Sequence, residues 1–106
     1  MKCMFSDCNS LINLNLSNFN TKNCTNMNGM FQNCLSLSNL DLSSFNTQKV
    51  IDIEYMFYDC KLLTDLNLSN FNIENIIKKE KVFYGCNSLK KEKIVSIEYI
   101  NIEEYK

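Results

Sequence analysis

Apolar residues return at the same spacing every 26 residues along this chain. A Met-Phe-x-x-Cys group begins at Met4, Met30 and Met56, and a weaker copy begins at Val82. Each of the first three copies continues with Leu-x-x-Leu-x-Leu-Ser and then with a second Phe. Self-similarity at a period of roughly 20–50 residues indicates stacked structural units. The pattern therefore predicts one unit per 26-residue row.

The rows divide a single domain, residues 1–106, into coils 4–29, 30–55, 56–81 and a degenerate C-terminal coil or cap, 82–106. One row cannot bury its apolar side chains alone, so its neighbours must cover them. The pattern predicts a repeat solenoid of four coils. We expect this chain to be a fragment of, or a short member related to, a longer repeat protein.

Within a row, two different periods predict two different walls. Leu14 and Leu16 are two residues apart, the period of a strand, so they should point inward while Asn13 and Asn15 point outward. The Met-Phe-x-x-Cys group lacks this alternation, and its spacing suits a helical turn. We therefore expect short parallel strands on one face and helical turns on the other. Asn20, Asn46 and Asn72 recur at the corner after each strand, where Asn side chains bond the backbone and help it bend.

Residues that share a row position should form continuous columns inside the stack. The predicted core columns are Phe5, Phe31, Phe57 and Phe83; Cys8, Cys34, Cys60 and Cys86; Leu14, Leu40 and Leu66; Leu16, Leu42 and Leu68; and Phe19, Phe45 and Phe71. Packing inside the core explains a Met or Phe that recurs once per row better than a cofactor groove does.

The cysteine column has two readings. Parallel coils stack about 4.8 Å apart, a spacing that disulfides between Cys8 and Cys34 or between Cys60 and Cys86 tolerate. Reduced cysteines also pack well as small apolar residues at a tight corner, which is the reading we favour. The redox state stays open. The cysteines form no Cys-x₂-Cys pair of the kind that zinc sites use, so we expect no metal.

Composition narrows the chemistry further. The 106 residues carry a net charge of -1, no His, and 2 Gly, so the chain offers no imidazole base and no Gly-rich phosphate loop. Its cysteines lack a His partner, and Asp7 and Asp59 stand as isolated carboxylates. We expect a protein that is not an enzyme and holds no cofactor.

The repeated motif resembles that of the BspA-like leucine-rich-repeat surface proteins, in particular a mycoplasma-type 26-residue repeat of unknown function. Met30 to Ile53 follows its Met-Phe-x-x-Cys-x-x-Leu-x-x-Leu-x-Leu-Ser-x-Phe pattern closely, and the likeness weakens after about residue 77. The resemblance implies a leucine-rich-repeat-like solenoid and a role in adhesion or host contact. It also implies a cell-surface or secreted protein, although this chain shows no signal peptide. Departures from the motif, such as Lys79 and Glu92 at apolar positions, fall late in the chain.

We expect a non-enzymatic protein-interaction module, part of a surface-exposed adhesin. The alternatives are a purely structural spacer or array fragment, and a cytosolic leucine-rich-repeat adaptor. The expected partner is a protein, with possible end-to-end self-association through an uncapped N-terminal coil. We expect no nucleic-acid partner and no membrane span. The candidate interaction face comprises Asn13, Asn15, Asn39, Asp41, Asp65, Asn67, Lys91 and Lys93 on the strand wall, with Tyr58 and Tyr84 on the turn wall.

Overall fold

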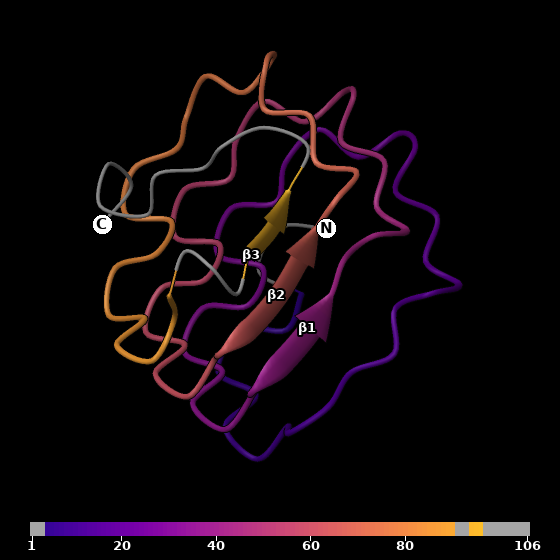
Figure 1. Ribbon diagram of the computed structural model, residues 1–106. Coiled ribbons are helices and arrows are strands. Elements are labelled where there is room, and N and C mark those ends of the chain that lie inside the picture. The colour runs from indigo at the N-terminus through magenta and orange to yellow at the C-terminus, as the bar shows by residue number, and fades with distance from the viewer. Residues whose placement is uncertain (1–3, 91–93, 97–106) are drawn as a thin grey trace.

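The computed structural model describes residues 4–90 and 94–96. Its regular secondary structure is one sheet of three short parallel strands, β1 (Asn39–Asp41), β2 (Asp65–Leu68) and β3 (Ile94–Ser96), in the order β1-β2-β3 (Figure 1). Each strand coincides with the Leu-x-Leu part of a row or its fainter continuation. In β1 and β2, buried Leu alternates with more exposed Asn or Asp, which is the alternation of a half-buried strand.

The register of the sheet follows the repeat between the first two strands and departs from it at the third. Leu40 lies opposite Leu66, one row apart in the sequence. Leu66 in turn lies opposite Ile94, two residues further along than the repeat predicts, which would have placed Glu92 there. Because side chains alternate along a strand, a shift of two residues preserves the alternation, whereas a shift of one would reverse it. The shift thereby brings an apolar residue, instead of a carboxylate, opposite Leu66.

Phenylalanine rings of successive rows lie directly above one another. The rings of Phe5 and Phe31 are stacked with centroids 5.5 Å apart, those of Phe31 and Phe57 are 5.8 Å apart, and those of Phe57 and Phe83 are 5.5 Å apart. A second column stacks Phe45 on Phe71 at 6.4 Å. These columns run through the core, where dispersion contacts accumulate along the stack.

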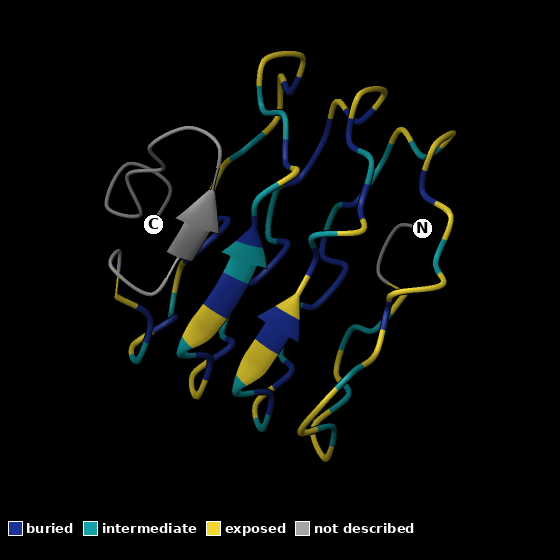
Figure 2. Cartoon of the chain, turned by 45° about the vertical axis from the view of Figure 1, so that its right-hand side comes forward, coloured by how far each residue is buried: buried dark blue, intermediate teal, exposed yellow. Residues whose placement is uncertain are grey.

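The row nearest the N-terminus is less buried than the rows that follow it. In Figure 2 most of this row has the exposed or intermediate colour. In that row Phe5, Cys8, Leu14 and Phe19 are half-buried, whereas Leu16 is buried. The other described members of the predicted columns all lie in the buried core: Phe31, Phe57, Phe83, Cys34, Cys60, Cys86, Leu40, Leu66, Leu42, Leu68, Phe45 and Phe71.

The wall opposite the sheet consists of hydrogen-bonded turns. Tyr55, Phe57 and Asp59 donate their N–H groups to the carbonyls of Glu80, Val82 and Tyr84 in the next row, at 3.2, 3.0 and 2.7 Å. Positive φ angles recur twice per row, for example 58° at Tyr55 and 57° at Asp59. They orient alternate backbone N–H groups toward the carbonyls of the next row. An α-helix needs these same N–H groups for bonds within its own segment, so a helical turn cannot form here.

The expected fold class, a four-coil leucine-rich-repeat-like solenoid with helical turns on one face, is therefore wrong. The residues that the structure describes contain no helix, and their strands number three, not one in each of four coils. The molecule is a small compact body with principal extents of 29 × 27 × 20 Å. Apolar spacing by one and three residues does not distinguish a helical turn from these paired turns, which explains the error.

Candidate functional site

The polar residues predicted for the strand wall lie at the surface. Asn13, Asn15, Asn39, Asp41 and Asp65 are exposed and Asn67 is half-buried. The sheet register brings Asn39 beside Asp65 and Asp41 beside Asn67. Asn13 and Asn15 lie outside the strands, and Lys91 and Lys93 lie outside the described residues.

One column of this wall shapes the backbone. The side-chain Oδ1 atoms of Asn15, Asp41 and Asn67 accept hydrogen bonds from the backbone N–H groups two residues further on, at 3.0, 2.9 and 3.0 Å. Hydrogen bonds from the Ser43 side chain and then from its backbone N–H hold the pKa of the Asp41 carboxyl below its usual value. Side chains committed to a turn of their own chain are poorly placed to bind a partner. Asn20, Asn46 and Asn72 make the same local bond at the next corner.

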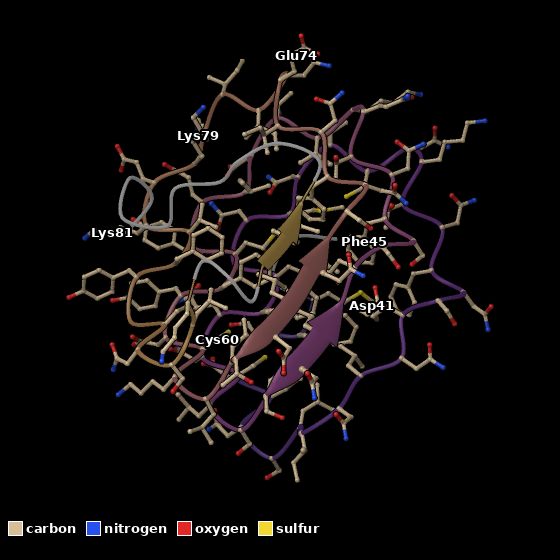
Figure 3. The ribbon with its side chains drawn as sticks, in the orientation of Figure 1. Asp41, Phe45, Cys60, Glu74, Lys79 and Lys81 are labelled. Carbon is tan, nitrogen blue, oxygen red and sulfur yellow. The ribbon has the colours of Figure 1, made fainter. Side chains whose placement is uncertain are left out.

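The turn wall carries a cluster of tyrosines, which we call the tyrosine corner and define as Tyr55, Tyr58, Lys81 and Tyr84. The rings of Tyr58 and Tyr84 are stacked with centroids 5.1 Å apart, and Tyr55 meets Tyr58 edge-on at 5.6 Å. Lys81 places its Nζ 5.4 Å from the centroid of Tyr84. Figure 3 shows Lys81 at the left-hand edge of the molecule, away from Asp41 at the end of β1.

The fold does not require aromatic residues at these positions. In the row before, Gln32 occupies the place of Tyr58 and Gly29 the place of Tyr55. Gly29 has a φ of 63°, which glycine adopts freely, whereas Tyr55 adopts 58°. Bulky residues in this left-handed region cost free energy. The positive φ itself belongs to the repeated turn, because Lys81 in the next row adopts 52°. Sequence reasoning named Tyr58 and Tyr84 but missed Tyr55, although its alignment with Gly29 was visible.

A hollow opens beside this corner, lined by Asp59, Lys61, Tyr84, Gly85 and Asn87. In the first two rows Asn33 donates a hydrogen bond from Nδ2 to Asp7 Oδ1 at 2.9 Å. Gly85 has the same position relative to Asp59 that Asn33 has relative to Asp7, but it carries no side chain. A Cβ built on Gly85 would lie 1.9 Å from Asp59 Oδ1. The Asp59 carboxylate thus leans over the Gly85 backbone. In the sequence, Asp59 stands out only as an isolated carboxylate, and the 26-residue pattern does not connect it with Lys61 or Asn87.

Among the described residues, Cys8, Cys34, Cys60 and Cys86 of the cysteine column form no disulfide, and neither does Cys24, which lies outside the column. Thiols of the column donate to phenylalanine carbonyls of the preceding row: Cys34 to Phe5 at 3.0 Å and Cys60 to Phe31 at 3.1 Å. Burial raises the pKa of the Cys34 thiol to about 11 and also raises that of Cys60. Since the thiolate is the reactive form, these cysteines are poor nucleophiles.

The described residues hold neither a metal-ligand cluster nor a helix able to span a membrane. Residues 4–90 and 94–96 contain no group of three or more His, Cys, Asp or Glu side chains arranged to hold a metal ion. Within the same ranges, no helix has the length and apolar character that crossing a membrane requires.

Short parallel strands, hydrogen-bonded turns and an aromatic corner define a small β protein built from repeated sequence rows. A family model described as "Mycoplasma protein of unknown function, DUF285" matches residues 1–97, so the chain belongs to this family. No curated protein and no solved structure matches the chain.

Proposed function

We propose that this protein is a non-enzymatic protein-interaction module of a surface-exposed adhesin, and that the tyrosine corner is its contact surface. We further propose kinship with the BspA-like surface proteins, supported by the motif that Met30 to Ile53 follows. The observation that carries the proposal is a tyrosine cluster at positions where the preceding row has Gly29 and Gln32, with Tyr55 held at a φ of 58°.

Tyrosine suits this role because it combines a large apolar ring with a hydroxyl and loses little entropy on binding. Interface hot spots are enriched in Tyr and cluster in packed patches. Tyr84 remains 46% exposed although it is stacked on Tyr58. The strand wall offers small polar side chains instead, several of them committed to turns.

The test measures binding of the purified chain to a panel of immobilised extracellular-matrix proteins by biolayer interferometry. The Tyr58→Gln/Tyr84→Gln variant takes its replacement residue from Gln32 of the preceding row, and Asn13→Ala/Asn39→Ala on the strand wall is the control. Losing two hot-spot tyrosines should weaken binding at least about tenfold, while the control stays within about twofold. Absence of saturable binding to the whole panel, or equal loss in both variants, would contradict the proposal.

A further inference from the structure

The hollow beside the tyrosine corner gathers polar groups that the fold leaves unused. Among the described residues, no hydrogen bond or ion pair engages the side-chain polar atoms of Asp59, Lys61, Asn87 or Tyr84. Comparable side chains elsewhere are engaged: Asn33 binds Asp7, and Lys49 Nζ binds Asn23 Oδ1 at 3.1 Å. These four residues line one open space, and no bond within the described part of the chain engages their polar side-chain groups.

One residue makes room for the Asp59 side chain at the floor of this space. Gly85 has a φ of 79°, and a Cβ built there would lie 1.9 Å from Asp59 Oδ1. The backbone of Asp59 is held by its own positive φ of 57° and by the N–H bond that it donates to the Tyr84 carbonyl at 2.7 Å. The half-buried Asp59 side chain thus lies over the Gly85 backbone, beside the open space.

The charges and hydrogen-bonding capacities select a class of ligand. Asp59 accepts hydrogen bonds, Lys61 donates them, and Asn87 does both. The one negative and one positive charge balance, so the hollow favours neither a cation nor an anion. Hydroxyl groups both donate and accept, so a ring carrying several of them can satisfy all three side chains at once. The Tyr84 ring, which is stacked against Tyr58, supplies an apolar wall.

We propose that the hollow formed by Asp59, Lys61, Tyr84, Gly85 and Asn87 binds a neutral saccharide. Sugar hydroxyls donate to the Asp59 carboxylate and accept from Lys61 Nζ and the Asn87 amide, while C–H groups of the sugar contact the Tyr84 ring. The site is shallow and takes one sugar residue, so we expect a dissociation constant on the order of 1 mM. Tyr84 belongs both to the tyrosine corner and to the hollow, whereas Tyr55 and Tyr58 do not line the hollow, so the two binding activities can be tested apart at those positions.

The experiment is an NMR titration of the ¹⁵N-labelled full chain with a panel of neutral methyl hexosides, up to about 100 mM because a millimolar dissociation constant is expected. Methyl glucuronide, an anionic sugar, forms a parallel arm. At least one neutral sugar should produce saturable shifts at the amides of Asp59, Lys61, Gly85 and Asn87. No saturable shift at this corner with any neutral sugar, or saturable shifts with the glucuronide alone, would overturn the proposal.

Two exposed substitutions locate the site without disturbing the core. Asn87→Ala should weaken the neutral sugar about fivefold, because one hydrogen bond to the ligand is lost. Asn9→Ala is the matched control, since Asn9 holds the same row position at the opposite end of the stack and is likewise exposed. Equal affinity of the Asn87→Ala and Asn9→Ala proteins would overturn the assignment. Tyr55→Gly, which takes its replacement from Gly29 of the row before, should leave sugar binding within about twofold of the unmodified chain, because Tyr55 neither lines the hollow nor is stacked on Tyr84. This variant separates the test from that of the protein-binding surface.

Discussion

Two buried threonine hydroxyls join neighbouring rows. Thr21 Oγ1 donates to the carbonyl of Asn46 at 3.1 Å and accepts from its N–H at 2.8 Å. Thr47 makes the same pair of bonds to Asn72, at 3.2 and 2.8 Å. Each hydroxyl thereby satisfies two backbone groups that would otherwise be buried without partners, a condition that costs about 1–3 kcal/mol per group. These threonines hold the corner in which the Asn column sits.

Buried thiols should make the protein less stable at alkaline pH. The pKa of Cys34 is raised from 9.0 to about 11 by burial, so between these values the unfolded chain loses its thiol proton and the folded chain keeps it. The free energy of unfolding should therefore be highest below pH 9 and fall as pH rises toward 11. Urea unfolding at several pH values measures this slope. Cys34→Ala should make the slope shallower, since Cys60 still contributes to it, and Thr25→Ala at an exposed position should leave it unchanged; equal slopes in the two variants would contradict the account.

At the scale of elements, the sequence predicted the strands more reliably than the turns. Leu40 in β1 and Leu66 in β2 lie where the Leu-x-Leu alternation predicts a strand, whereas the same alternation at Leu14 and Leu16 forms none. The helical turn predicted for the Met-Phe-x-x-Cys group is wrong, because Tyr55 and Asp59 adopt positive φ, which their residue types alone do not favour. The register shift at Ile94 depends on pairing with Leu66 and is likewise invisible in the row alignment.

The candidate site was predictable only in part for the same reason. Tyr58 and Tyr84 share a row position, so stacking of rows suffices to bring them together. The hollow depends on which way Asp59 points and on the absence of a side chain at Gly85, and neither follows from apolar periodicity. The predicted strand-wall residues Asp41 and Asn67 proved to cap their own turns, a role that depends on local backbone geometry.

The turn that contains Gly85 should tolerate no side chain. Gly85→Ala places a Cβ at a φ of 79° and against Asp59, so we expect the free energy of unfolding to fall by about 1–3 kcal/mol. Chemical denaturation measures the change. Asn87→Ala, two residues further on and exposed, should change stability by less than about 0.5 kcal/mol. A Gly85→Ala protein as stable as the Asn87→Ala protein would contradict this description of the turn.

For the molecule as a whole, the repeated rows act as a platform that positions variable surface residues. Phe57 and Phe83 inside the core fix the spacing between the third and fourth rows, and that spacing sets Tyr58 beside Tyr84 on the outside. Burial decreases toward the first row, where Phe5 and Leu14 are half-buried. Local stability should decrease in the same direction, because fewer apolar contacts hold that row. The tyrosine corner and its hollow therefore lie on the surface of rows whose core is well buried.

The central claim is that residues one row apart lie in contact, and ring-to-ring nuclear Overhauser effects test it most directly. In a protein with selectively protonated Phe and Tyr rings, the account predicts cross-peaks between Phe31 and Phe57, between Phe57 and Phe83, and between Tyr58 and Tyr84. It predicts none between Phe31 and Phe83, which are separated by the ring of Phe57. A spectrum without the Phe57–Phe83 and Tyr58–Tyr84 cross-peaks would contradict both the stacking and the sites built on it.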